Sequence, residues 1–151
     1  MSVLAKNVLI LIFLVGYAAA CTQSDTPVSK SIWETNLKSA LLRAQNESKP
    51  VLIDFGADWC KPCKRMHQEV FVDPKIQKHL KDSFVPLLID VTDMTPSLSR
   101  LLQSYRVGTL PSVVFLRPNG NFLEGQTLVG FSAVERLDER LLAVLKVISG
   151  A

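Results

Sequence analysis

Two cysteines separated by two residues follow a short apolar run, and this arrangement constrains the chain more than any other feature of its sequence. The apolar run covers residues 51–55 and is bounded by Pro50 and Gly56, which is typical of a buried strand. Cys60 and Cys63 follow it within the sequence DWCKPC. We therefore expect both thiols at the junction between a buried strand and the next helix.

Segments with strand-like and helix-like patterns alternate along the chain, which predicts an α/β fold. Ser31 and Glu34 have the spacing of a capping box, so a first helix is expected over residues 32–45. Ser132 and Glu135 repeat this spacing before the last helix. Further helices are expected over 63–70, 74–80 and 96–104, and further strands over 85–91, 111–116 and 127–129.

Apolar positions indicate which faces of the first and last helices are buried. The first is expected to bury Ile32, Leu37, Leu41 and Leu42, and the last Val134, Leu137, Leu141, Leu142 and Leu145. No internal repeat or second domain is found, so one α/β domain is expected over residues 31–151.

The first 20 residues have the pattern of a secretory signal and are excluded from the expected fold. Lys6 precedes an uncharged stretch over residues 7–20, whose apolar core is shorter than the roughly 20 residues that cross a membrane. Removing residues 1–20 takes away one cation and no acid, so the formal net charge falls from +3 to +2. A charge this small, with no basic patch, predicts no nucleic-acid partner.

Cys21 directly follows this segment and is the odd cysteine once the other two are paired. The stretch that ends in Cys21 resembles a bacterial lipobox, with Ala18 where a larger aliphatic residue is usual. We therefore expect a lipid-modified Cys21 and a polar tether over residues 21–30. Cleavage by ordinary signal peptidase after the alanines at 18–20 is the alternative.

The cysteine pair admits three interpretations besides a redox dithiol. A zinc site needs about four nitrogen or sulfur ligands, and no second Cys-x-x-Cys accompanies Cys60 and Cys63, so no metal is expected. Haem attachment requires a histidine directly after the second cysteine, where Lys64 stands. A purely structural disulfide across so small a loop would restrain the unfolded chain little.

A redox dithiol explains the neighbouring residues as well. Unpaired amide N–H groups and the positive end of the dipole at a helix N-terminus would stabilise a Cys60 thiolate. Lys61 and Lys64 add positive charge, and Pro62 fits the first turn, where a missing N–H costs nothing. Cys63 lies one turn further along, within reach of a mixed disulfide on Cys60.

The sequence WCKPC at residues 59–63, after the apolar run, resembles the active site of the thioredoxin family, with lysine where thioredoxin has glycine. VGTLPS at 107–112 resembles the cis-proline loop of that family, and VGF at 129–131 resembles the segment before its last helix. The resemblance covers roughly residues 31–148. It implies a thioredoxin fold, in which a central mixed β-sheet has helices on both faces.

Two further segments, ADWC at residues 57–60 and VFVDPKI at 70–76, are similar to the C-terminal periplasmic domain of the DsbD family. The full DsbD protein carries reducing equivalents outward through a membrane. The resemblance therefore implies a protein that faces the periplasm of a bacterial cell envelope.

The resemblance also implies roles for individual residues. Cys60 is implied as the exposed nucleophile and Cys63 as the resolving thiol. Asp54 matches a buried carboxylate that moves a proton to or from Cys63, and its place in an apolar run supports this role because an unpaired buried carboxylate is costly. Leu110-Pro111 matches the cis peptide bond that faces the dithiol and binds substrate.

Residues around the dithiol complete the implied site. Trp59 is implied as a shield of the active site that contacts substrate. Lys61, Pro62 and Asp58 lie close enough in sequence to tune the thiols. The DsbD-like domain has an acidic residue one turn after the second cysteine, and His67 occupies that place here. We interpret His67 as a solvated helix residue, with a proton shuttle as the alternative.

The function implied is an envelope thiol:disulfide reductase that reduces disulfides of extracytoplasmic client proteins through a mixed disulfide. The sequence has no nicotinamide or flavin motif, so no cofactor is expected and a membrane thiol electron donor must re-reduce the dithiol. A monomer, anchored to a membrane if Cys21 is acylated, is expected. The alternatives are a non-catalytic peptide-binding module, and a disulfide oxidase or isomerase on the same scaffold.

Overall fold

The apolar run after Pro50 forms the central strand β1 (Val51–Gly56), and every residue of this strand is buried. The computed structural model describes residues 31–150. The expected signal peptide over residues 1–20, the tether over 21–30 and Cys21 lie outside the described residues. Within the described range, no helix is both long enough and apolar enough to cross a membrane.

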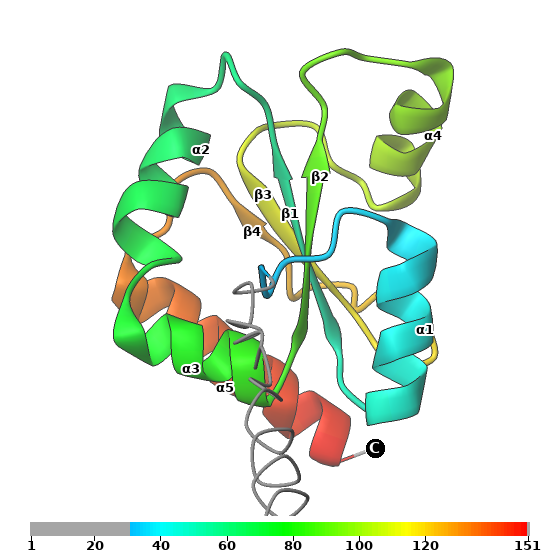
Figure 1. Cartoon of the computed structure of the whole chain (residues 1–151), viewed down its shortest axis with the longest axis vertical. Coiled ribbons are helices and arrows are strands. Elements are labelled where there is room, and N and C mark those ends of the chain that lie inside the picture. The colour runs from blue at the N-terminus through cyan, green and yellow to red at the C-terminus, as the bar shows by residue number, and fades with distance from the viewer. Residues whose placement is uncertain (1–30, 151) are drawn as a thin grey trace, which may run out of the picture. The chain divides into compact units, whose positions relative to one another are not determined.

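The four strands form one mixed sheet in the order β2-β1-β3-β4 (Figure 1). β1 pairs in parallel with β2 (Val85–Asp90) and antiparallel with β3 (Ser112–Leu116), and β4 (Leu128–Val129) pairs antiparallel with β3. The helical elements are α1 (Leu37–Glu47), α2 (Lys61–Arg65), the π-helical turn η1 (Met66–Val70), α3 (Pro74–Asp82), α4 (Pro96–Ser104) and α5 (Val134–Ser149).

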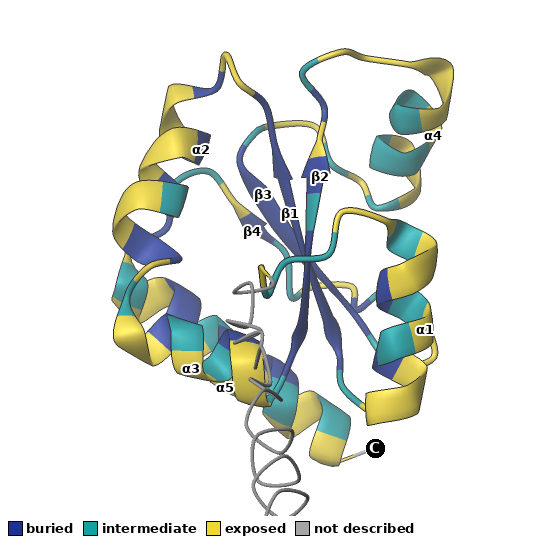
Figure 2. Cartoon of the chain, in the orientation of Figure 1, coloured by how far each residue is buried: buried dark blue, intermediate teal, exposed yellow. Residues whose placement is uncertain are grey.

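Helices cover both faces of the sheet, as the resemblance implied, and the buried residues concentrate in the strands and the inner helix faces (Figure 2). Side chains of a strand alternate between faces. Ile53 and Phe55 of β1 pack in the cluster that holds the inner faces of α1 and α4, whereas Leu52 packs in the cluster of η1, α3 and α5. Asp54 has the parity of Leu52, so its carboxyl group points toward η1.

The expected capping box at the first helix is wrong. Glu34 is not helical but forms a parallel β-bridge with Leu87, in which the Glu34 N–H donates to Pro86 O at 2.8 Å. The helix begins instead at Leu37, where the side chain of Asn36 accepts a hydrogen bond from Ser39 N at 3.0 Å. Pairing with the sheet therefore holds this segment extended in spite of its local helix-start pattern.

The expected burial of one leucine in each terminal helix is also wrong. Leu42 of α1 is 54% exposed and Leu142 of α5 is 51% exposed. Ala40 and Ala44 form the buried side of α1. In α5, Asp138 is buried, and it is paired at 2.7 Å with Lys75 Nζ and at 3.0 Å with His79 Nε2 of α3.

The second expected capping box, at Ser132, is wrong as well. Ala133 occupies the cap position of α5, and no side chain accepts a hydrogen bond there. Ser132 is 1% exposed, and its Oγ atom has no hydrogen-bond partner within residues 31–150. The hydroxyl group is thus buried without the capping bond that its sequence position suggested.

Ser132 and Asn36 give opposite predictions for the free energy of unfolding. We expect Ser132→Ala to keep or raise the free energy of unfolding, by up to about 1 kcal/mol, because it removes an unpaired buried hydroxyl. Asn36→Ala should lower it by about 1 kcal/mol because it removes the cap of α1. Urea denaturation of both variants checks this, and a loss in Ser132→Ala equal to that in Asn36→Ala would contradict it.

Candidate active site

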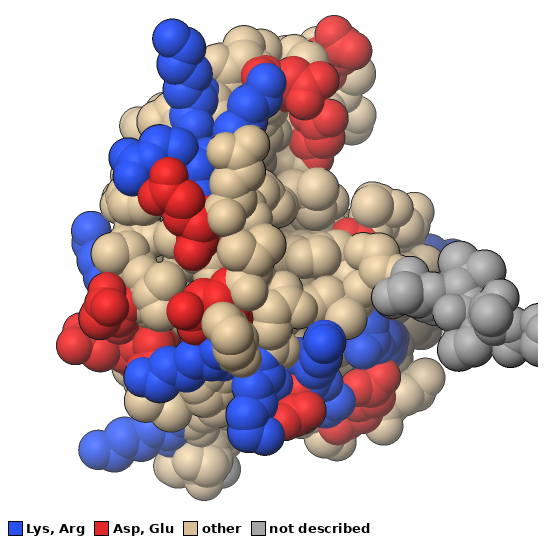
Figure 3. All heavy atoms as spheres, turned by 60° about the vertical axis from the view of Figure 1, so that its left-hand side comes forward, with Lys and Arg blue, Asp and Glu red and all other residues tan. Residues whose placement is uncertain are grey.

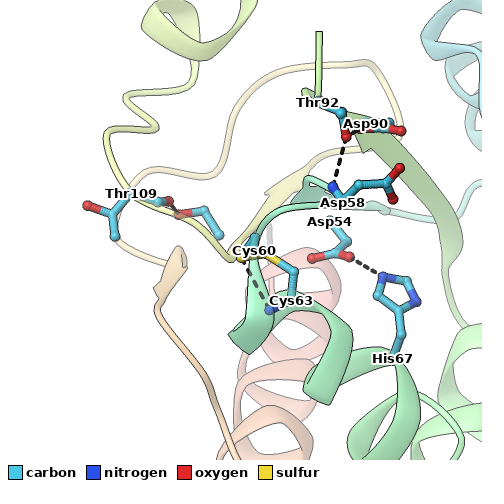
Figure 4. The surroundings of a disulfide bond; sticks show 9 residues. Asp54, Asp58, Cys60, Cys63, His67, Asp90, Thr92 and Thr109 are labelled. Atoms are coloured by element: carbon cyan, nitrogen blue, oxygen red, sulfur yellow. Dashed lines mark hydrogen bonds and ion pairs between the residues drawn. A yellow bond between two sulfur atoms is a disulfide. The ribbon is translucent and has the colours of Figure 1, made fainter. Parts of the chain in front are cut away.

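Cys60 and Cys63 form a disulfide at the start of α2, directly after β1 (Figure 4). Cys60 is the N-cap residue of α2, and its Sγ accepts a hydrogen bond from Cys63 N at 3.3 Å. Pro62 lies in the first turn, where no intrahelical acceptor exists for its missing N–H. The sulfur of residue 60 therefore lies where helix N–H groups stabilise negative charge.

Cys60 lines a groove on one side of the disulfide, although only 5% of its surface is exposed in this oxidised form. The groove has a volume of about 520 Å³ and is lined mainly by apolar groups, among them Trp59, Met94 and Leu110. Trp59 is 64% exposed at its rim. The Leu110-Pro111 peptide bond is cis, as the resemblance implied, and Leu110 contributes to the same wall. We call this recess the client groove.

Asp54 is buried behind the disulfide with 1% of its surface exposed. A Cβ atom built on Gly56 would lie 3.9 Å from Cys63 Sγ and 4.0 Å from Asp54 Oδ2, so the thiol and the carboxyl group face the same small space. Oδ1 of Asp54 has no hydrogen-bond partner within the described residues. Burial raises the pKa of Asp54, and His67 opposes this rise only in part.

The interpretation of His67 as a solvated helix residue is wrong. Its Nε2 atom lies 2.7 Å from Asp54 Oδ2, and about a third of its side chain is exposed. The imidazole ring packs against two aromatic rings that also contact each other, with centroid distances of 5.7 Å to Trp33 and 5.1 Å to Phe71. The spacing of four residues from Cys63 was the available signal, because such positions share a helix face.

Charged side chains surround the dithiol on the surface. Lys61 and Lys64 of α2 are exposed and form no ion pair among the described residues, and cationic side chains gather at the level of α2 in Figure 3. Asp58 is also exposed, and its N–H donates to Thr92 Oγ1 at 2.8 Å. Thr92 in turn bonds Asp90, so the end of β2 holds the loop that carries Trp59.

The groups near the dithiol do not form a metal site. Among the described residues, no set of three or more histidine, cysteine, aspartate or glutamate side chains is arranged to hold a metal ion. The chemistry that this geometry supports is thiol–disulfide exchange, with one sulfur at a helix N-terminus facing a groove and a second behind it.

This sheet order, with a Cys-x-x-Cys disulfide after the central strand and a cis-proline beside it, defines a thioredoxin-fold protein with a redox-active dithiol. The thioredoxin-like family model matches residues 32–118, and the chain belongs to that family.

Individual relatives narrow this assignment to a domain related to the C-terminal domain of DsbD. The chain is 34% identical to thiol:disulfide interchange protein DsbD of Photorhabdus laumondii over 66% of its own length and 17% of the relative. The DsbD C-terminal domain of Neisseria meningitidis in the reduced form superposes with a TM-score of 0.62 at 32% identity, covering 71% of this chain and 92% of that one. A thioredoxin from Thermus thermophilus superposes with a TM-score of 0.68 at 28% identity, covering 78% and 89%.

The chain spans about a fifth of the length of the curated relatives that it matches. The matched part thus contains the thioredoxin-like domain with its Cys-x-x-Cys pair and belongs to a family of thiol:disulfide interchange oxidoreductases.

The raised pKa of Asp54 gives a pH-dependent prediction. When the pKa of a carboxyl group is higher in the folded than in the unfolded protein, the free energy of unfolding falls as the pH rises from the unfolded pKa to the folded pKa. We therefore expect the oxidised wild type to lose free energy of unfolding relative to Asp54→Asn between pH 4 and pH 8. The loss should be about 1.4 kcal/mol for each pH unit that separates the two pKa values. Urea denaturation at pH 4, 6 and 8 measures it, and a difference that stays constant with pH would refute the assignment.

Proposed function

We propose that this protein is a thiol:disulfide reductase of the bacterial cell envelope that reduces disulfides in extracytoplasmic client proteins. The observation that carries the proposal is the unequal placement of the two sulfurs. Cys60 lines the client groove at the N-terminus of α2, whereas Cys63 lies behind it, close to Asp54. The similarity to DsbD proteins supports the envelope location and the interchange chemistry.

The reaction follows from this placement. The Cys60 thiolate attacks one sulfur of a client disulfide, forms a mixed disulfide and releases the other client sulfur as a thiolate. Cys63 then loses its proton to the Asp54 carboxylate and attacks the Cys60 sulfur. The bond between Cys60 and the client breaks, the client leaves as a second thiolate, and the Cys60–Cys63 disulfide remains.

A membrane thiol donor completes the cycle in this proposal. Two electrons must return to the Cys60–Cys63 disulfide, and the sequence has no motif for a nicotinamide or flavin. A second dithiol protein can supply them by the same exchange in reverse. We propose a DsbD-like transducer as that donor and acylation of Cys21 as the means of holding the domain near the membrane.

The first prediction from this proposal concerns the two cysteines. We expect the wild type to accelerate the reduction of insulin by dithiothreitol, and Cys60→Ser to abolish the acceleration because the nucleophile is lost. Cys63→Ser should instead accumulate a mixed disulfide with insulin, since the resolving thiol is missing. Turbidity and non-reducing gel electrophoresis measure these outcomes.

A non-catalytic peptide-binding module would leave insulin reduction unaccelerated by the wild type. An oxidase would be recognised in cells, where acid quenching followed by alkylation should find a reductase mostly in the dithiol form. Recovery of the protein mostly as the disulfide would contradict the proposed direction of electron flow.

The second prediction concerns Lys61. Its charge stabilises the Cys60 thiolate and hence the reduced form, so Lys61→Gly should lower the reduction potential by tens of millivolts. A change of about 30 mV corresponds to 1.4 kcal/mol for a two-electron couple. This energy is the upper range of the stabilisation that an exposed cation gives to a nearby thiolate. Equilibration with glutathione measures the potential, with Lys61→Arg as the charge-preserving control. An unchanged or higher potential in Lys61→Gly would reject the role of Lys61.

A further inference from the structure

A second cavity lies on the opposite side of the disulfide from the client groove. It has a volume of about 230 Å³, and its lining includes Cys63 and His67 but no residue that lines the client groove. Figure 4 shows the disulfide between Thr109, which lines the client groove, and His67. We call this recess the back cavity. The two cysteines therefore line two separate cavities, Cys60 the client groove and Cys63 the back cavity.

Asp54 cannot exchange its proton with solvent directly. Its side chain is 1% exposed, it does not line the back cavity, and its one side-chain partner within residues 31–150 is His67. In the proposed reaction this carboxyl group gains a proton each time Cys63 is activated, and a docked client covers the client groove at that moment. A route for the proton is therefore needed on the other side of the disulfide.

We propose that His67 carries this proton between Asp54 and the solvent of the back cavity. The inference rests on the proposed reductase function, because it concerns the step in which Cys63 releases the client. His67 bonds Asp54 and does not line the client groove, so it acts through Asp54 as a proton-conducting and positioning residue rather than a catalytic one.

The proton steps balance along this route. Cys63 gives its proton to Asp54, and the Asp54 carboxyl group gives a proton to Nε2 of a neutral His67. The resulting imidazolium releases the proton on Nδ1 to water, which leaves the opposite tautomer of the neutral ring. Ring nitrogens act as donor or acceptor according to protonation, so the 2.7 Å contact is satisfied with the proton on either partner.

The surroundings of His67 suit a residue that changes protonation at fixed position. Trp33 and Phe71 hold the ring by aromatic contacts and bring no charge to it. The titratable groups that line the back cavity with His67 are Asp58, Cys63, Lys64 and Asp90. On the same helical segment, Arg65 and Glu69 pair with each other at 2.9 Å. Carboxylates and a cation thus share the lining of the back cavity with His67, where water can take up the proton.

The test isolates the Cys63 step with 5,5′-dithiobis(2-nitrobenzoate) as the probe. Reduced protein releases one nitrothiobenzoate when Cys60 forms the mixed disulfide and a second when Cys63 displaces it, and stopped-flow absorbance separates the two phases. We expect His67→Gln, which keeps a hydrogen-bonding group but cannot carry a proton, to slow the second phase about tenfold at pH 7 and to leave the first unchanged.

Rescue by imidazole distinguishes a proton-conducting His67 from one that only packs against its neighbours. His67→Ala leaves space beside Asp54 that connects to the back cavity, so added imidazole should restore the second phase in proportion to its concentration. The matched control is His79→Gln, because His79 bonds Asp138 between α3 and α5, away from the dithiol. That variant should match the wild type in both phases, with and without imidazole.

The outcomes separate this inference from the proposed function. A second phase in His67→Gln as fast as in the wild type overturns the relay, and so does a failure of imidazole to accelerate His67→Ala. If the wild type does not accelerate insulin reduction but imidazole restores His67→Ala in the probe reaction, the proposed function fails and the relay stands.

Discussion

The burial of β1 on both faces is the constraint on which the rest of the structure depends. β1 lies inside the sheet with helices packed on both of its faces, so the strand ends where the two helical layers end. The short loop after that end places Cys60 at the start of α2, beside the cis-proline loop. The same burial encloses Asp54, whose pKa rises because the carboxyl group has left water. The position of Cys60 and the raised pKa of Asp54 thus share one cause.

Much of this architecture could be predicted from the sequence, because its signals are local. The strand between Pro50 and Gly56, the start of α3 after Asp73 and the extent of α4 follow from apolar runs and helix caps. The predictions were wrong where contacts with distant parts of the chain determine the local structure. Glu34 is extended because it bonds the edge of β2. Leu142 is exposed because the face of α5 that packs on α3 and the sheet carries Leu137, Leu141 and Val144 instead.

The candidate site shows the same division. Asp54 could be identified because a carboxylate within an apolar run must be buried, and the cysteine spacing indicated the dithiol directly. For His67, the spacing indicated a shared helix face with Cys63, but the carboxyl group that this face meets could not be predicted from the sequence. Only the packing of η1 against β1 shows that it meets a carboxylate. The back cavity is likewise a product of tertiary packing, since its lining comes from β1, β2, α2, η1 and the loop between β1 and α2.

The bridge at Glu34 also bears on how this molecule behaves at high concentration. An outer strand normally displays unsatisfied amide and carbonyl groups that invite another chain to add to the sheet. Here the outward groups of Pro86 and Leu88 are occupied by Glu34, and proline has no N–H to offer. At the opposite margin, β4 is only two residues long. Both rims of the sheet are therefore blunted against intermolecular strand addition.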